Sequence, residues 1–263
     1  MTSRSVAELK KLTKRLGLQV TQTSNRENKK DYVKVLQDYY LKEKYPEGVP
    51  SWLKVRLSMD SPMLCAQITG LKPEAAEQVW NSDDWVFEEK INGVRMMLFW
   101  DGQELHACSR NLSLQDYLPV DYVDKFAFAP ELEQKLRAAG APKFILDTEI
   151  TFSNSNVRTY LYNVKGVETV TMLQAVAAVL ALNTEDSLKI QVTEGHFVLN
   201  VFDILFFGKS LMNKPYSERY DYLMQFYSQY GVLFGDILSI PPRCTDSAQK
   251  KDFYSGILAR GLS

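Results

Sequence analysis

The first part of the chain places apolar residues at the spacing of two amphipathic helices. The two series are Val6, Leu9, Leu12 and Leu16, followed by Tyr32, Leu36, Tyr39 and Tyr40. Ser5 with Glu8 three positions later forms a capping box, which predicts a helix that begins at Ser5 and ends at Gly17. Asn28 is the expected cap of the second helix. The pattern therefore predicts a helical hairpin.

The stretch from Lys44 to Pro50 is rich in proline and glycine and predicts a domain boundary, with residues 1–48 before it and residues 49–263 after it. Beyond it, short runs of β-branched and aromatic residues predict strands. The expected strands are 85–89, 94–100, 105–109, 144–152 and 197–206, and the expected helices are 132–139, 171–182, 217–230 and 247–262. Asp101-Gly102 is a hairpin turn signal. We expect an α+β domain with an antiparallel sheet.

Composition narrows the class of protein. Among the 263 residues, 45% are hydrophobic and 24% are charged, which suits a globular core. The three cysteines, Cys65, Cys108 and Cys244, lack the number and spacing of a disulfide framework or a zinc site. The chain shows no signal peptide, and its apolar runs are far shorter than the roughly 20 residues that span a bilayer. We expect a cytoplasmic protein that does not enter a membrane.

The net charge of −1 hides an uneven distribution. Residues 1–54 contain 12 Lys and Arg against 6 Asp and Glu, a balance of +6, so the remainder of the chain carries −7. Lysine and arginine side chains laid on phosphates release condensed counterions, which favours a polyanion partner for the amino-terminal part. A solvated helical face is the alternative interpretation.

Residues 88–95, Glu-Glu-Lys-Ile-Asn-Gly-Val-Arg, contain the clearest chemical signal. Lys90 stands just before an Asn-Gly turn, between two expected strands, so that its amine would have a fixed position. An amine attacks only when deprotonated, which requires desolvation or nearby cations. An ordinary hairpin with a surface lysine is the alternative.

This run resembles motif I, Lys-x-Asp-Gly-x-Arg, of the covalent nucleotidyltransferases, which include ATP-dependent DNA ligases, RNA ligases and mRNA capping enzymes. Other stretches are similar to motifs of that superfamily in the same order: Pro62-Met63-Leu64 ahead of motif I, residues 109–111 at motif Ia, residues 144–150 at motif III and residues 202–219 at motif IIIa. The long last match favours the DNA ligases. The resemblance implies an antiparallel-sheet nucleotidyltransferase domain, the ATP-grasp-like adenylation domain of a ligase.

The resemblance also implies roles for the matched residues. Lys90 would attack the α-phosphate of ATP to form lysyl-AMP. Glu88 would accept a hydrogen bond from the adenine amino group, which selects adenine over guanine. Phe202 would stack on the purine, although a core phenylalanine is the common alternative. Arg95 and Arg110 would hold the ribose or the phosphates through bidentate contacts.

Glu149 would hold the ribose or Mg²⁺, which prefers hard oxygen ligands, and a strand-end salt bridge is the alternative. Two residues depart from the family pattern. Asn92 replaces the usual Asp of motif I, and Thr148 replaces the usual Gly of motif III, which questions how closely backbone and ligand approach there. His106 and His196 have no metal-ligand spacing, so we expect both to be structural.

The amino-terminal hairpin resembles the SAP motif, a small DNA-binding module, over residues 5–41. An accessory helical pair packed on the main domain is the alternative. Motifs IV and V and the oligonucleotide-binding barrel of DNA ligases are not present in the sequence, so we expect a fragment of a longer enzyme that adenylates poorly alone.

The sequence therefore favours a monomeric ATP-dependent DNA ligase that acts on nicked duplex DNA with ATP and Mg²⁺. An RNA ligase or capping-type enzyme is the nearest alternative. A non-catalytic DNA-binding protein with a degenerate ligase fold is the alternative from a different class. An NAD-dependent ligase fits less well, because the hairpin does not resemble that family's amino-terminal domain.

Overall fold

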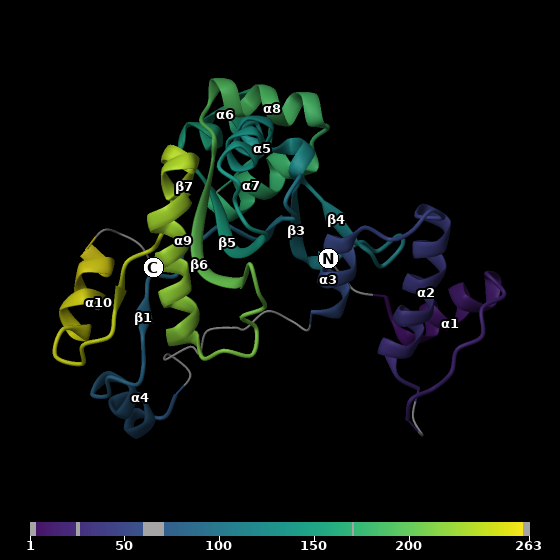
Figure 1. Ribbon diagram of the computed structural model, residues 1–263, viewed down its shortest axis with the longest axis horizontal. Helices are drawn as coiled ribbons and strands as arrows, with labels where there is room; N and C mark the ends of the chain where they lie inside the picture. The colour runs from purple at the N-terminus through teal and green to yellow at the C-terminus, as the bar shows by residue number, and fades with distance from the viewer. Residues whose placement is uncertain (1–3, 25–26, 60–70, 170, 260–263) are drawn as a thin grey trace.

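A computed structural model of the chain describes residues 4–24, 27–59, 71–169 and 171–259. Its centre is a six-stranded sheet with the order β4-β3-β2-β5-β6-β7 (Figure 1). The strands are β2 (Val94–Trp100), β3 (Leu105–Leu112), β4 (Pro119–Asp121), β5 (Phe144–Phe152), β6 (Phe197–Phe207) and β7 (Leu238–Ser239). Neighbouring strands are antiparallel except β6 and β7, which are parallel. The expected antiparallel sheet is confirmed, with one parallel strand at its edge.

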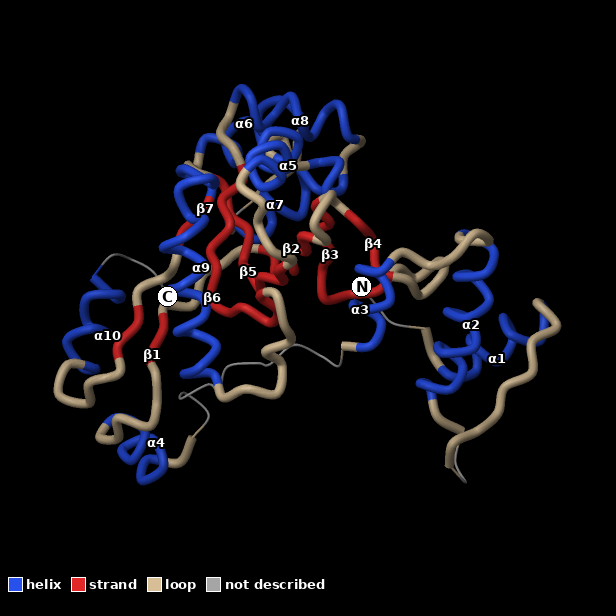
Figure 2. The backbone as a smooth tube through the Cα atoms, in the orientation of Figure 1, coloured by secondary structure: helices blue, strands red, loops and turns tan. Residues whose placement is uncertain are grey.

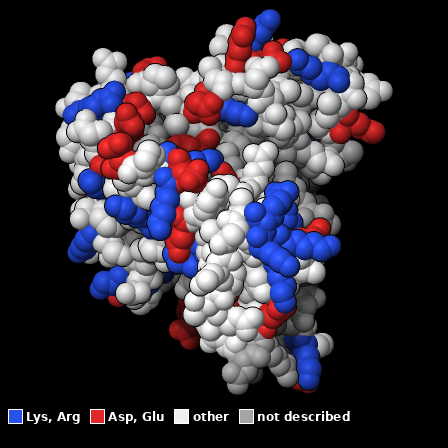
Figure 3. Space-filling model, turned by 90° about the vertical axis from the view of Figure 1, so that its right-hand side faces the viewer, with Lys and Arg blue, Asp and Glu red and all other residues white. Residues whose placement is uncertain are grey.

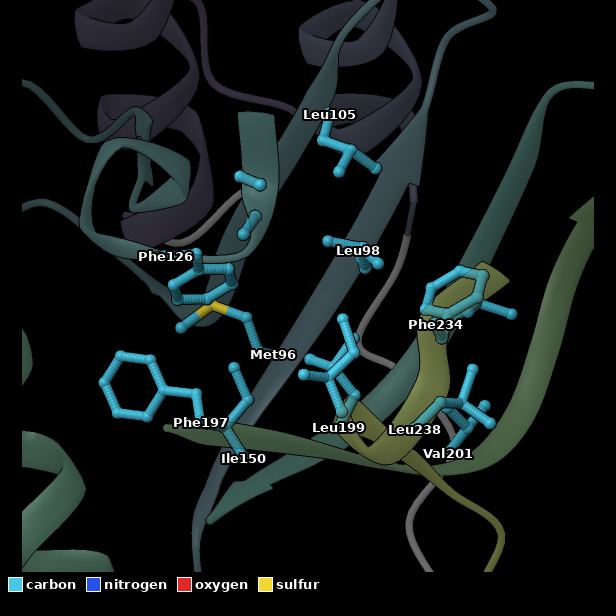
Figure 4. Packing of buried hydrophobic residues seen from close by; sticks show 14 of the residues in the cluster. Met96, Leu98, Leu105, Phe126, Ile150, Phe197, Leu199, Val201, Phe234 and Leu238 are labelled. Carbon is cyan, nitrogen blue, oxygen red and sulfur yellow. The ribbon is translucent and has the colours of Figure 1, made fainter. Parts of the chain in front are cut away.

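Helices cover one face of this sheet and bury the main core (Figure 2). They are α5 (Ala129–Ala138), α6 (Asn156–Lys165), α7 (Met172–Ala181), α8 (Thr184–Thr193) and α9 (Tyr216–Phe234), with the short 3-10 helices η2 (Val123–Lys125) and η3 (Gly235–Ile237). Alternate strand residues point into this layer, among them Met96, Leu98, Ile150 and Leu199 (Figure 4). The residues between them therefore face the opposite side of the sheet.

A single helix, α3 (Ser51–Ser58), packs on part of that opposite face. Its Trp52 and Leu53 bury Met97 and Phe99 of β2. The Trp52 ring also stacks on the imidazole of His106, with 4.6 Å between the ring centroids. One part of this face is thus closed by α3, and the polar residues described below lie on the same face.

A second, two-stranded sheet lies beside two further helices. These elements are β1 (Phe87–Glu88), β8 (Arg243–Cys244), α4 (Pro73–Trp80) and α10 (Lys250–Ala259). Lys250 is fully buried and joins the two helices: its ammonium donates to the carbonyl oxygens of Val79, at 3.1 Å, and Ser82. The same ammonium lies 5.0 Å from the centre of the Phe87 ring. Lys250, the first residue of α10, therefore binds the carbonyl oxygens at the end of α4 and packs on β1.

The amino-terminal helices α1 (Val6–Arg15) and α2 (Lys29–Lys44) form the predicted hairpin. The Ser5–Glu8 capping box, the Asn28 cap and the left-handed Gly17 after α1 are confirmed. The hairpin's apolar core contains a residue of the larger part of the chain, Tyr117, from the loop between β3 and β4.

Two polar contacts strengthen this docking. The Gln37 amide donates to the Tyr117 carbonyl oxygen at 2.8 Å, and Lys44 pairs with Asp116. Tyr117 has a φ of 59°, the left-handed region that non-glycine residues rarely adopt. The packed helical pair, one of the two interpretations of this segment, is therefore part of the structure.

Several element predictions need correction. The expected strand 85–89 shrinks to β1, because only two of its residues find a partner in β8. Four helices, α3, α4, α6 and α8, were not predicted. They have eight to ten residues, and α3 and α4 have no side-chain cap that would mark their start.

Candidate active site

The loop between β1 and β2 presents Lys90 at the surface, and its charge counteracts the rise in the pKa of the Glu149 carboxyl. Gly93 fixes this loop against β5. Its N–H donates to Glu149 Oε1 at 3.1 Å, and an added Cβ would come within 2.1 Å of the Ile150 carbonyl oxygen. No side chain fits in that space, so the glycine of the Asn-Gly turn is required by close backbone approach.

The neighbouring strands bring Arg95, Glu149 and Phe202 together. Arg95 of β2 and Glu149 of β5 are direct register partners, so their side chains leave the same face of the sheet. The guanidinium carbon of Arg95 lies 5.1 Å from the centre of the half-buried Phe202 ring of β6. These residues, with Lys90, form one surface on the face opposite the helical layer.

A β-bulge in β6 gives Phe202 its position. Asp147 pairs with Asp203, and the next residue, Thr148, pairs with Val201, so that Phe202 is an extra residue. Val201 and Ile204 both point into the helical core although they are three positions apart. Strict alternation would place them on opposite faces, so the bulge lets Phe202 and Asp203 share the site face.

Two ion pairs that sequence reasoning missed support these residues. Arg95 binds Asp147 through both Nε (3.0 Å) and Nη2 (2.6 Å). Arg219 of α9 holds Asp203 in the same two-pronged manner, with Nη2 2.7 Å from Oδ2. Such bidentate pairs fix the plane of a guanidinium. The only signal in the sequence was that Asp147, Asp203 and Arg219 lie inside the matched stretches.

Glu88 ends β1 and accepts a hydrogen bond from the hydroxyl of Tyr216, the first residue of α9. The same hydroxyl lies 3.2 Å from the carbonyl oxygen of Phe202. Arg243, the register partner of Glu88 in β8, covers the ring of Tyr220 with 3.1 Å between its guanidinium carbon and the ring centre. The two residues expected to recognise the base are therefore joined through Tyr216.

Arg110 is the outlying member of the predicted set. It lies on β3, one position beyond the Met96–Ser109 pair, and its side chain is exposed. Its carbonyl oxygen accepts a 3.0 Å hydrogen bond from Nη2 of Arg56, a buried residue of α3. Among the residues that the structure describes, Arg110 forms no ion pair, so its guanidinium faces solvent beside the strand of Arg95.

Burial raises the pKa of the Glu149 carboxyl, and the Gly93 amide, Arg95 and Lys90 act in the opposite direction. Burial likewise raises the pKa of Glu88, against the hydrogen bond from Tyr216 and the charge of Arg243. Both carboxyls are thus partly withdrawn from water, where a hydrogen bond to a ligand is stronger than at the open surface.

Thr148, which replaces the usual Gly of motif III, does not reduce the space on the site face of the sheet. Thr148 is fully buried in the helical layer and its hydroxyl donates to the Met96 carbonyl oxygen at 2.9 Å, whereas Glu149 faces the other way. Nothing in the structure explains Asn92, which is exposed. His106 lies 2.8 Å from Asp121 and His196 lies 3.4 Å from Asp236.

Cys108 and Cys244 are buried and free, and burial raises the pKa of the Cys108 thiol to about 12. Cys65 and the Pro62-Met63-Leu64 stretch lie outside the described residues.

A family model for the ATP-dependent DNA ligase domain matches residues 62–237, which contain every site residue above except Arg243. The chain belongs to the ATP-dependent DNA ligase domain family. The adenylation fold expected from the motifs is thereby established, since the matched part of this ligase domain carries the antiparallel sheet and the motif residues.

Solved structures similar to this ligase domain include a mycobacterial DNA ligase D complexed with ATP and MES, at 17% identity and a TM-score of 0.40, covering 65% of this chain and 44% of that one. Another is the ligase domain of LigD from M. tuberculosis, at 18% identity and a TM-score of 0.36, with the same coverage of 65% and 44%. The ligase domain thus spans less than half the length of these structures. No curated protein matches it.

The donor set restricts what metal the ligase domain can hold. Within the described ranges, no three His, Cys, Asp or Glu side chains converge as a metal cage. Mg²⁺ is commonly bound by one or two carboxylates together with substrate phosphates and water, and Glu149 offers such a carboxylate. Among the residues that the structure describes, Glu149 therefore fits a Mg²⁺ held together with substrate phosphates and water. In the described part of the chain, no helix has the length and apolar character to cross a bilayer.

Proposed function

We propose that this chain is the nucleotide-binding part of an ATP-dependent DNA ligase that seals nicks in duplex DNA through lysyl-AMP. The observation that supports it most is the Lys90 loop, clamped by Gly93 against Glu149 within the ligase family match. A surface lysine in an ordinary hairpin needs no such clamp.

In the proposed reaction, the uncharged Nζ of Lys90 attacks the α-phosphorus of ATP. A nitrogen–phosphorus bond forms, the bond to the β-phosphate oxygen breaks, pyrophosphate leaves and the amine loses a proton. Bound Mg²⁺ would neutralise phosphate charge. Glu149 would hold the ribose or the ion, and Arg95 and Arg110 would bind ribose or phosphate oxygens.

Base recognition would fall to Glu88 and Phe202. The Glu88 carboxylate accepts from the 6-amino group of adenine and repels the 6-carbonyl oxygen of guanine. The purine would stack on the Phe202 ring, whose other neighbour is the Arg95 guanidinium.

The amino-terminal hairpin, residues 1–48, would be the DNA-binding module of this ligase. Figure 3 looks onto the hairpin side of the molecule, where Lys and Arg side chains gather. The exposed members that make no ion pair within the described ranges include Lys11, Lys14, Arg15 and Lys30. They would lie along the phosphate backbone, which gives binding without base specificity.

The test is covalent labelling of the 263-residue chain. Incubation with ATP or GTP labelled at the α-phosphate and Mg²⁺, followed by denaturing electrophoresis, should give labelled protein with ATP only, at a low level because the chain is expected to adenylate poorly alone. Lys90→Ala should abolish the label, and Lys90→Arg should fail equally because a guanidinium stays protonated.

Lys189→Ala is the matched control, because Lys189 is a lysine on α8, outside the site. It should label like the wild type. Label retained in Lys90→Ala would exclude Lys90 as the nucleophile, label from GTP would favour a capping-type enzyme, and no label with either nucleotide would favour the non-catalytic DNA-binding protein.

A further inference from the structure

We propose that Tyr216 is a positioning residue for purine selection, because its hydroxyl ties the carboxyl group of Glu88 to the backbone of Phe202. This inference rests on the proposed function, in which Glu88 and Phe202 recognise adenine. Tyr216 would thus affect the preference for adenine over other purines without touching the nucleotide.

The geometry joins three separate elements at one oxygen atom. Glu88 belongs to the small sheet, Phe202 to the large sheet and Tyr216 to the start of α9. The Tyr216 hydroxyl donates to Glu88 Oε1 and lies 3.2 Å from the Phe202 carbonyl oxygen. A shift of either sheet relative to the other would therefore stretch a contact to this hydroxyl.

Because of the bulge, Phe202 has no register partner in β5, so its backbone carbonyl is available to accept a hydrogen bond from outside the strand ladder. At a bulge the extra residue is left out of the strand ladder, so its backbone polar groups need other partners. The Tyr216 hydroxyl, whose single proton is donated to Glu88, lies 3.2 Å from this carbonyl oxygen, at the residue whose ring would stack on the base. The hydroxyl that donates to Glu88 thus also lies against the strand that carries Phe202.

The Tyr216 ring is itself held in place. The guanidinium carbon of Arg219 lies 5.6 Å from its centre, and Arg219 is locked by Asp203, the residue after Phe202. Pro215 precedes the ring at the start of α9 with φ −54°. Removing only the hydroxyl should leave this packing unchanged.

The hydroxyl leaves one oxygen of Glu88 for a ligand. Tyr216 contacts Oε1, and Oε2 accepts no hydrogen bond from any residue that the structure describes. Adenine presents an amino group at position 6, whereas hypoxanthine presents a carbonyl oxygen there. A carboxylate held in one orientation repels that carbonyl oxygen, but one that rotates freely can turn away and admit water.

The experiment compares Tyr216→Phe with the wild-type chain in equilibrium binding of ATP and of ITP, with EDTA present so that no AMP transfer follows. We expect the preference for ATP over ITP to fall by roughly tenfold, which corresponds to one hydrogen bond to a charged group. A purely structural role would weaken both nucleotides equally and leave the ratio unchanged, which would overturn the inference.

Tyr227→Phe is the matched control, since Tyr227 is a partly exposed tyrosine on the same helix, and its ratio should equal that of the wild type. Glu88→Asp provides a second route, because the shorter side chain retracts the carboxylate from Tyr216. It should also lose the preference, and adding Tyr216→Phe to it should change the ratio no further.

Two results would contradict the inference in different ways. Independent, additive losses in the double variant would show that Tyr216 does not act through Glu88. A wild-type chain that binds ATP and ITP equally would overturn the proposed adenine recognition itself, and the inference with it.

Discussion

Phe202 is half-buried at a bulge, with the Arg95 guanidinium on its ring and Tyr216 on its carbonyl. A ring placed only to fill the core would point into the helical layer, as Val201 and Ile204 do. We expect Phe202→Ala to weaken ATP binding by about 1 to 3 kcal/mol, the range for base–aromatic stacking. Phe202→Tyr keeps the flat face and should bind ATP as the wild type does.

Isothermal titration with ATP measures both affinities, and thermal unfolding establishes that the variants are folded. An alanine variant that is folded and binds ATP with unchanged affinity would assign Phe202 to packing alone.

At the level of single residues, the sequence predicted Lys90, Glu149 and Phe202 as candidate site residues, because they stand at fixed spacings within recognisable motifs. It could not predict Asp147 and Tyr216 as partners. Their roles depend on which strand faces which and on the bulge that changes the alternation of β6, and neither is visible in local spacing.

Among the elements, α10 has Lys250 as its buried residue in the part of the chain that the structure describes. The Lys250 ammonium satisfies the carbonyl oxygens of Val79 and Ser82 near the end of α4. Lys250→Met keeps the length of the side chain but leaves these carbonyls without a donor, so we expect a loss of about 1 to 3 kcal/mol in the free energy of unfolding. Urea denaturation measures it, and hydrogen exchange should rise in α4 and α10 together.

Lys251→Met is the control, since Lys251 is the exposed neighbour on the same helix. Equal stability of the two methionine variants would mean that the Lys250 contacts contribute nothing net.

In the large sheet, β2 and β5 have the bounds that their apolar and β-branched runs indicated, and β3 and β6 begin where predicted but end later. The short edge strands β4 and β7 were not predicted. In the small sheet, β1 was predicted too long and β8 was not predicted, because each strand has two residues and the two come together from distant parts of the chain. Pairs of this kind are fixed by tertiary packing rather than by propensity.

In the whole molecule, the hairpin contacts the remainder of the chain at Tyr117 and Asp116. Lys11, Lys14 and Arg15 of the hairpin are exposed and form no ion pair within the described ranges. Docking and DNA binding are therefore compatible. We expect the triple change of these three residues to Gln to weaken binding to nicked duplex DNA. The slope of log affinity against log salt should become shallower by roughly 0.9 for each DNA phosphate that these side chains no longer neutralise.

Lys189→Gln on α8 is the control and should leave the slope unchanged. Deleting residues 1–48 should weaken DNA binding in the same way and leave adenylation nearly intact, because the nucleotide-site residues lie beyond Pro50. Equal salt slopes for the wild type and the triple variant would mean that the hairpin only packs.

Because of the bulge at Phe202, deletion of one residue there should affect the fold and the site differently. Between the same end partners, β6 has 11 residues and β5 has nine. Deletion of Phe202 would make the strand regular there, with Val201 and Ile204 still pointing into the core. A deletion within β2, which has no bulge against β5, would instead reverse the faces of all residues after it. Deletion of the Phe202 codon is thus a way to remove the proposed nucleotide site while the folded chain survives.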